Sequence, residues 1–275
     1  VSEAVFGEKT DKNILTVKIA DNRAPHFLVI GGTGSGKSVF INYVLTSLMF
    51  HNSPEELKFI IVDPKLVEFS RYKGLPFMLC DPITNMEDAY AMLNWLCLES
   101  LRRNEIMAKY GVRNLDDYWE LYDNYEDKKG EPRPEDMERF PLLIMVFDEY
   151  ASALDIVGDK IENPLKFIGQ YGRSSGEDII LATQRASADI VSSSIKANFA
   201  GRVALKTSSI NDSNIILGDT GNFITADQLK GRGDGIYKDP ESNFIRFQSG
   251  FIPDDQIEEI FKFLKEKYPN TEFLD

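Results

Sequence analysis

The sequence places a glycine-rich octapeptide, GGTGSGKS, directly after an unbroken apolar run. The run HFLVIGG (26–32) is typical of a buried parallel strand, and a helical pattern follows the octapeptide. Residues Gly31 to Ser38 fit G-x-x-x-x-G-K-[ST] in full, in the strand–loop–helix context that this motif requires. The feature restricts the chain to α/β folds in which backbone N–H groups and a helix N-terminus bind phosphate.

The octapeptide predicts a site for ATP and Mg²⁺. Lys37 is expected to reach the β- and γ-phosphates, and the hydroxyl of Ser38 is expected to bind the metal ion. The alternative is a glycine-rich turn with a chance lysine, which the matching context disfavours. The residues predicted to contact the nucleotide are Gly32, Thr33, Gly34, Ser35, Gly36, Lys37, Ser38 and Val39.

Further apolar runs predict strands that alternate with helices, and hence a mostly parallel sheet covered on both faces. The N-terminal segment 13–20 alternates like an edge strand, and the end of the chain predicts an additional β pair and a helix. The predicted elements are strands at 57–63, 141–150, 178–185 and 201–207, a long helix at 86–109 with Met92 and Leu101 among its inward residues, a β pair at 233–250 and a helix at 253–268.

Composition excludes several classes of protein. No run approaches 18 apolar residues, so no membrane span is expected, and the N-terminus lacks the layout of a signal peptide. The chain begins at Val1 rather than Met, as a fragment of a longer protein would. Two cysteines and two histidines that form no sequence cluster predict neither disulfides nor zinc, and a reduced, cytoplasmic setting is the simpler interpretation.

The net charge of −13 argues against a nucleic-acid partner, but it is unevenly distributed. Between Asp116 and Glu138, ten acidic side chains face three basic ones, so this segment carries seven of the thirteen net charges. We interpret 116–140 as an acidic surface insertion, a short helix followed by an exposed loop. Its aromatic stretch 118–125 is expected to be a buried helix face rather than a partner surface.

Two adjacent acids end the strand predicted at 141–150. Asp148 is expected to hold Mg²⁺, and Glu149 to orient and deprotonate the attacking water. The alternative is that both acids cap the following turn. The pair favours hydrolysis over kinase chemistry.

Polar residues at the next strand suggest further roles. Gln184 ends that strand and is predicted to sense the γ-phosphate, whereas Arg173 lies before it in a glycine- and serine-rich stretch, read as a turn. An exposed arginine there could reach the ATP of a neighbouring subunit, but the stretch alone favours an ordinary solvated arginine. Asp63 and Lys65 end another strand, and the sequence leaves open whether they contact the nucleotide or form a turn.

Taken together, these motifs resemble the FtsK/SpoIIIE family of hexameric double-stranded DNA translocases. The resemblance covers nearly the whole chain, and several long motifs occur in the family's order. They include PHFLVIGGTGSGKSVFIN, NSPEELKFIIVDPKLVEFSRYKGLPFML, KYGVRNLDDY, SSGEDIILATQRASADIVSSSIKANFAGRVAL and LKGRGDGIY.

The resemblance implies a RecA-like ATPase motor domain (25–275) behind a lead-in strand segment (1–24). It implies that Arg173 completes the ATP site of a neighbouring subunit in a homo-hexameric ring. It also implies that Arg185 and Lys196 contact the backbone of duplex DNA. From Arg185 to Lys206 the sequence carries four bases and one acid, so the local charge is positive although the chain is acidic.

Some positions depart from the family pattern. Tyr150 follows the acid pair where Leu or Phe is usual, and Ala186 replaces a proline. Ile210 and Asn214 stand where the family often has lysine and arginine, so the role of that lysine is lost or moved, for example to Lys206. These changes suggest a divergent member of mobile-element or phage type. A membrane-anchoring region and a DNA-reading domain are expected outside this chain.

The sequence therefore predicts an ATP-hydrolysing ring motor that translocates double-stranded DNA. Alternatives are a protein-export ATPase of the type VII secretion kind, a conjugation coupling or DNA-packaging ATPase, and a nucleotide-gated scaffold without turnover. The intact Asp148–Glu149 pair argues against the scaffold.

Overall fold

The computed structural model describes residues 3–19 and 26–269 and has one nine-stranded sheet, in the order β2-β1-β9-β8-β7-β3-β6-β5-β4. Five strands are parallel to one another, and the last two strands of the chain continue the sheet in antiparallel pairing, as the sequence predicts. The strands are β1 (Glu3–Lys9), β2 (Ile14–Lys18), β3 (Phe27–Ile30), β4 (Leu57–Val62), β5 (Leu142–Phe147), β6 (Glu177–Thr183), β7 (Gly201–Leu205), β8 (Asp234–Lys238) and β9 (Phe244–Gln248).

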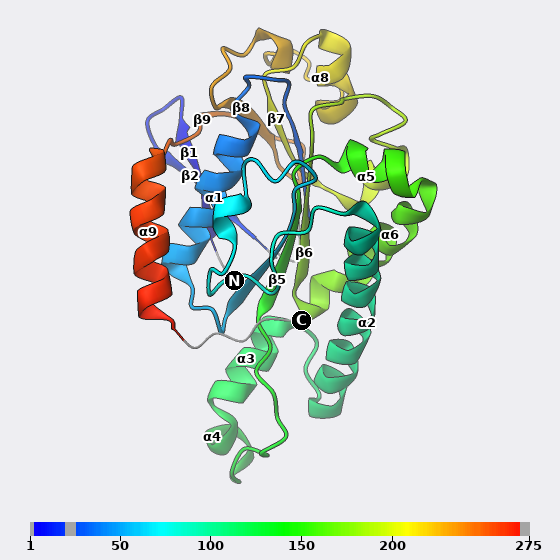
Figure 1. Cartoon of the computed structure of the whole chain (residues 1–275). Coiled ribbons are helices and arrows are strands. Elements are labelled where there is room, and N and C mark those ends of the chain that lie inside the picture. The colour runs from blue at the N-terminus through cyan, green and yellow to red at the C-terminus, as the bar shows by residue number, and fades with distance from the viewer. Residues whose placement is uncertain (1–2, 20–25, 270–275) are drawn as a thin grey trace.

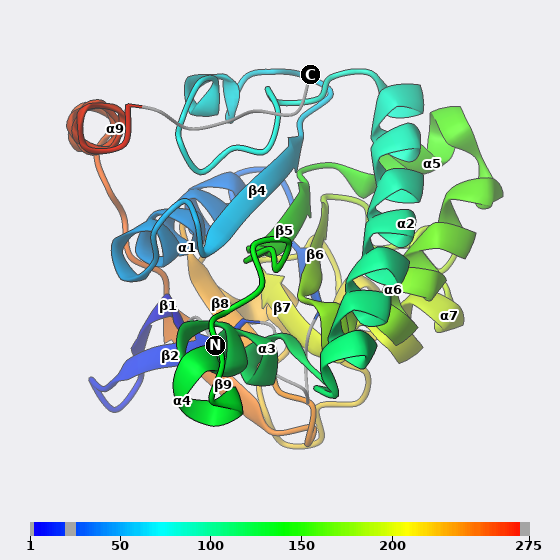
Figure 2. The same cartoon turned by 90° about the horizontal axis from the view of Figure 1, so that it is seen from below.

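Helices cover both faces of the sheet (Figures 1 and 2), as the fold class requires. One face carries α1 and α9, and the other carries α2, α5 and α6. The helices are α1 (Lys37–His51), α2 (Met86–Tyr110), α3 (Leu115–Asp123), α4 (Tyr125–Lys129), α5 (Tyr150–Val157), α6 (Glu162–Ser175), α7 (Ser193–Asn198), α8 (Ile210–Leu217) and α9 (Asp254–Lys267).

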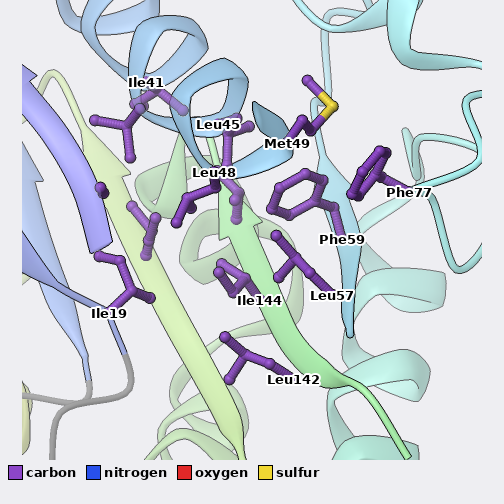
Figure 3. Packing of buried hydrophobic residues seen from close by; sticks show 14 of the residues in the cluster. Ile19, Ile41, Leu45, Leu48, Met49, Leu57, Phe59, Phe77, Leu142 and Ile144 are labelled. Atoms are coloured by element: carbon purple, nitrogen blue, oxygen red, sulfur yellow. The ribbon is translucent and has the colours of Figure 1, made fainter. Parts of the chain in front are cut away.

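Alternating side chains of the central strands divide the core into two layers. Phe59 and Ile144 face α1, whereas their chain neighbours Ile60 and Met145 face α2 and α5. Figure 3 shows the first layer, in which Leu45 and Leu48 of α1 lie over the sheet. The layers bury every residue of β3, β4, β5 and β6, which is why these strands consist mostly of apolar residues.

The lead-in region contributes two strands rather than one. β2 is the predicted edge strand, and β1 lies between it and β9 in the same sheet. The predicted boundary between 24 and 25 lies outside the described residues, and the division into a lead-in segment and a motor domain stays a prediction.

Two expectations about helices were wrong. Leu101 of α2 is exposed, because the inward face of this helix passes instead through Ser100 and Arg103. The segment after 116 forms a second short helix, α4, before the loop. Both α3 and α4 extend from the end of the sheet opposite to α8 (Figure 1). Tyr118 and Tyr125 are buried in the first core layer, so the aromatic stretch is a buried helix face, as expected.

Candidate functional site

The octapeptide forms the loop between β3 and α1 at the carboxyl edge of the parallel strands. Gly34 and Gly36 have left-handed backbone angles (φ 77° and 94°), which glycine adopts at least cost. A Cβ at Gly36 would lie 2.6 Å from the backbone nitrogen of Gly233, so no larger residue fits there. Helix α1 begins at Lys37 with no acid in its first turn. The loop therefore leads a helix N-terminus into an open, anion-binding position.

Lys37 and Asp148 are in direct contact across the site. The Lys37 side chain is 4% exposed, and its Nζ lies 2.7 Å from Asp148 Oδ1 and also donates to the Asp148 carbonyl oxygen. Ser38 follows Lys37 in the first turn of α1. A hydroxyl and a carboxylate are the oxygen ligands that Mg²⁺ prefers, so this donor set fits a metal bound together with phosphate oxygens.

Glu149 is turned toward the end of β6. Its carboxylate accepts hydrogen bonds from the Thr183 hydroxyl and, at 3.0 Å, from the backbone N–H of Gln184. Its side chain makes no capping bond to helix α5, although it occupies the residue before that helix. Since Asp148 is engaged with Lys37, neither acid uses its side chain as a cap, contrary to the alternative interpretation.

Gln184 contacts the phosphate-binding loop directly. Its Oε1 accepts a hydrogen bond of 3.2 Å from the Thr33 hydroxyl. β6 lies next to β3 in the sheet, which brings the ends of the two strands together. The structure thus gathers the predicted residues Thr33, Lys37, Asp148, Glu149 and Gln184 at one edge of the sheet.

Arg173 lies elsewhere, and its predicted turn was wrong. It belongs to the last turn of helix α6, is exposed, and precedes β6. β6 has seven residues, about 20 Å of strand, between Arg173 and the edge that holds the site. The glycines of this stretch allow the helix to pack closely. A Cβ at Gly172 would lie 2.8 Å from the carbonyl oxygen of Glu177, so this position requires glycine.

Part of the positive charge near the predicted DNA-contacting residues is already paired or bonded within the protein. Arg185 is exposed and forms an ion pair of 2.6 Å with Asp155. Lys196 is half-buried on α7. Arg202, which contributed to the positive local charge, donates to the carbonyl oxygens of Phe199, Lys196 and Ile216. Arg202 is therefore bound to the protein itself.

Other polar residues have structural roles. Asp63 is buried and accepts hydrogen bonds from the backbone N–H groups of Lys65, Leu66 and Phe69, so this motif forms a turn. His26 is buried, with Nδ1 3.1 Å from Asp178 Oδ1 and Nε2 3.2 Å from the Ile168 carbonyl oxygen. Within 3–19 and 26–269, no group of three or more potential metal-binding side chains is found. Over the same residues, no helix is long and apolar enough to span a membrane.

Sequence reasoning missed three contacts of the site. Thr183 positions Glu149, and as the hydroxyl residue before Gln184 it could have been noticed. The carbonyl oxygen of Lys206 accepts from the Gly32 N–H at 2.9 Å. The segment Gly231–Asp234 lies against the phosphate-binding loop, and only its glycines hinted at a close backbone approach.

A separate polar cluster lies at the amino edge of the strands. Arg103, 2% exposed, has its Nε 2.7 Å from Glu99 and 3.3 Å from Glu177, and it donates to the carbonyl oxygens of Pro141 and Ser175. Burial raises the pKa of Glu177 to about 7, although the Arg103 charge opposes that rise. This cluster ties α2 and α6 to the start of β6.

Comparison with known proteins gives consistent relatives. The model of the FtsK/SpoIIIE family matches residues 3–188. The DNA translocase FtsK of Lactococcus lactis subsp. lactis (strain IL1403) is 37% identical over 266 residues, 96% of this chain and 34% of that protein. The DNA translocase FtsK of Pseudomonas aeruginosa (strain PAO1) is 38% identical over 251 residues, 86% of this chain and 30% of that protein. The chain thus spans about a third of the length of these relatives.

Solved structures share the fold. The cytoplasmic domain of the Thermomonospora curvata type VII secretion ATPase EccC superposes with a TM-score of 0.78 at 27% identity, covering 95% of this chain and 30% of that one. The pCW3 conjugation coupling protein TcpA, in its monomer form with ATPγS, has a TM-score of 0.74 at 24% identity, covering 95% of this chain and 70% of that one. The RecA-like P-loop ATPase fold predicted from the sequence is confirmed.

Proposed function

Because this chain belongs to the FtsK/SpoIIIE family, we propose that it is the ATP-hydrolysing motor of a ring that translocates double-stranded DNA. The observation that carries the proposal is the arrangement at the carboxyl edge. There Lys37 contacts Asp148, and Glu149 is held beside Gln184, which contacts the phosphate-binding loop. A chain that only bound nucleotide would not need a second acid positioned by β6.

In this proposal the N–H groups of Thr33, Gly34 and residues 36–39 surround the phosphates, and Lys37 contacts the β- and γ-phosphates. The N–H groups of Gly32 and Ser35 are bonded to the carbonyl oxygens of Lys206 and Gly32 instead. Entering phosphate oxygens compete with Asp148 for the Lys37 ammonium group. Ser38 and Asp148 would hold Mg²⁺, which supplies charge neutralisation at the phosphates.

Glu149 is the proposed general base. Its carboxylate accepts a proton from the water that attacks the γ-phosphorus, and the products are ADP and inorganic phosphate. The Thr183 hydroxyl and the Gln184 N–H fix the direction in which the carboxylate points. Gln184 is then linked both to Glu149 and to the loop that binds the phosphates, which suits a residue that senses the γ-phosphate.

The position of Arg173 supports assembly into a ring, proposed to be a homo-hexamer. Since Arg173 is exposed about one strand length away from its own site, it would complete only the site of a neighbouring copy. Six copies would bring six Arg185 and Lys196 side chains to a central duplex, where phosphate contacts give affinity without sequence preference.

ATP hydrolysis measured with and without duplex DNA, across salt concentrations, tests the function. We expect DNA to stimulate turnover and rising salt to weaken that stimulation. Replacing both Arg185 and Lys196 by Gln should reduce the magnitude of the slope of log K for DNA against log salt, by about 0.9 for each phosphate contact that the ring loses. Asp155→Asn should strengthen DNA binding, because it frees Arg185 from its ion pair. Turnover that ignores DNA at every salt concentration contradicts the proposal.

A second candidate is protein export, which the similarity to the EccC ATPase favours. In that case a peptide substrate, and not DNA, would stimulate hydrolysis. A conjugation coupling or DNA-packaging role would keep the chemistry and change only the setting. The proposed location is the cytoplasm, with any membrane-anchoring region or DNA-reading domain outside this chain.

A further inference from the structure

The segment Gly231–Asp234, here called the strap, is bonded to the backbone of the phosphate-binding loop. The N–H of Gly233 donates to the Ser35 carbonyl oxygen at 2.8 Å, and the N–H of Arg232 approaches the Gly34 carbonyl oxygen at 3.4 Å. Gly36 lies so close that a Cβ on it would overlap Gly233. The strap therefore contacts three successive residues of the loop.

These bonds orient the loop for phosphate. In a planar trans peptide the C=O and the N–H point in opposite directions. Since the Ser35 carbonyl points toward the strap, the N–H of Gly36 in the same peptide group points away from it, to the side proposed to bind phosphate. The strap thus fixes the direction of a donor that it does not itself provide.

The strap has a conformation that needs support. Gly231, Arg232 and Gly233 have φ angles of 86°, 53° and 88°, so three successive residues are left-handed and one of them is not glycine. Asp234 supplies the support, because its carboxylate accepts from the Lys230 N–H at 2.8 Å and from both Nε and Nη2 of Arg246 at 2.9 and 2.8 Å.

The last residue of β9 and the residue after it add further bonds and connect the strap to the sheet. The Gln248 side-chain amide donates to the Arg232 carbonyl oxygen at 2.8 Å, and the Ser249 N–H donates to the Gly233 carbonyl oxygen at 2.8 Å. Burial alone would raise the pKa of Asp234, but hydrogen bonds from Arg246 and Lys230 lower it below its ordinary value, so the carboxylate stays ionised at neutral pH. The pair Asp234–Arg246 is thus a permanent anchor.

We propose that Asp234 and Arg246 are positioning residues for nucleotide binding, which act through the strap on the loop Gly34–Gly36. The inference rests on the proposed function and adds to it a pair that touches no nucleotide. Loosening the anchor should weaken binding of the phosphates, which depends on loop geometry. It should leave the chemical step almost unchanged, because Glu149 is held by β6 instead.

The test compares Arg246→Gln with the parent in Mg·ATP binding by calorimetry and in steady-state hydrolysis. We expect Kd and KM to rise about tenfold with kcat within about twofold, since a bidentate charged pair is lost. Pyrophosphate should lose affinity by a similar factor, because only phosphate contacts are affected. Arg246→Lys, which keeps the charge and one contact, should recover part of the affinity.

Arg102→Gln is the matched control. Arg102 also makes a bidentate pair, to Glu99, with similar exposure of the two partners (42% and 10%, against 34% and 6% for Arg246 and Asp234). It should lower Tm about as much as Arg246→Gln without changing Kd. If the two variants lose equal stability and both keep the parental Kd, the positioning role is wrong.

The outcomes separate this inference from the proposed function. If the parent binds no ATP, or if Lys37→Ala binds it as well as the parent, the proposed function fails. If the parent binds ATP and Arg246→Gln binds it equally, only the positioning role fails. Should Arg246→Gln show no cooperative melting, Arg246→Lys and Asp234→Asn provide the same comparison, with the same unchanged Kd as the contradicting result.

Discussion

The two edges of the parallel strands differ in how accessible most of their polar side chains are, although the Lys37–Asp148 pair at the carboxyl edge is also buried. At the carboxyl edge, Glu149 and Gln184 are partly or fully accessible and bonded to neighbouring loops. At the amino edge, Arg103 and Glu177 are buried together with Ser175 and bonded within the protein. A ligand can compete for the first set and cannot reach the second. A cluster of charged side chains therefore indicates a reactive site only where a ligand can replace the present hydrogen-bond partners of those side chains.

Arg173 is the exception at the amino edge. It is exposed, and in the described part of the chain its side chain has no hydrogen bond or ion pair, although it sits next to the buried cluster. The cluster fixes the end of α6 and so holds the backbone from which Arg173 extends. We therefore expect each edge to present one reactive group, Glu149 at the carboxyl edge and Arg173 at the amino edge.

The largest effect is expected for Arg173→Ala, which tests the role of the amino edge. In assembled protein we expect kcat to fall about 10³-fold, because a transition-state charge from the neighbouring subunit is lost. Adding Lys37→Ala subunits, which still carry Arg173, should restore part of the turnover. Arg113→Ala is the control, since Arg113 is also exposed and lies near the same end. Parental turnover, or no recovery on mixing, would show that Arg173 does not act between subunits.

Glu149→Gln tests the carboxyl edge. We expect kcat to fall about 10²- to 10³-fold with ATP affinity retained, because the proposed base is lost and the proposed phosphate contacts remain. Single-turnover hydrolysis and equilibrium binding measure the two quantities. Glu259→Gln, an exposed acid on α9, should change neither. Equal loss of binding and turnover would assign Glu149 to the binding contacts instead.

The amino edge should appear in the pH dependence of stability. The pKa of Glu177 is about 7 in the folded chain and near 4.5 when unfolded, so between these values the folded state binds the extra proton. The free energy of unfolding should therefore fall as pH rises from about 4.5 to 7, by up to about 3 kcal/mol. Glu177→Gln should flatten this slope in denaturant titrations. A variant with the parental slope contradicts the assignment.

The smallest expected effect concerns Thr183. Thr183→Val removes the hydroxyl that positions Glu149 and should lower kcat about tenfold, whereas Thr183→Ser should keep most of the activity. KM should change little in either variant. If Val and Ser behave alike, the hydroxyl does not orient the base.

Elements with a strong local signal were predictable from the sequence. The buried strands read as apolar runs, and α9 buries Ile257, Phe261 and Leu264 at helical spacing. The octapeptide and the acid pair indicated the candidate site because each motif consists of consecutive residues. β1 was missed, since its register shifts between Val5 and Gly7 and its alternation is broken.

The remaining contacts depend on distant segments. The strap and the phosphate-binding loop are about 200 residues apart, so no local pattern reveals that they are bonded. The helix that contains Arg173 packs closely at Gly169 and Gly172. A Cβ added at either position would lie within 3 Å of another residue. Propensity alone suggests a turn for such a stretch, and tertiary packing overrides it.

The distance along the chain between the strap and the loop has a consequence for synthesis. A ribosome adds about 5–20 residues per second, so about 10–40 s pass between the appearance of Ser35 and that of Gly233. For most of this time the loop lacks its partners on β6 and β7, and for all of it the loop lacks the strap. We therefore expect nucleotide to reach its full stabilising effect only after Gly233 has been translated, and not to act as an early template for folding.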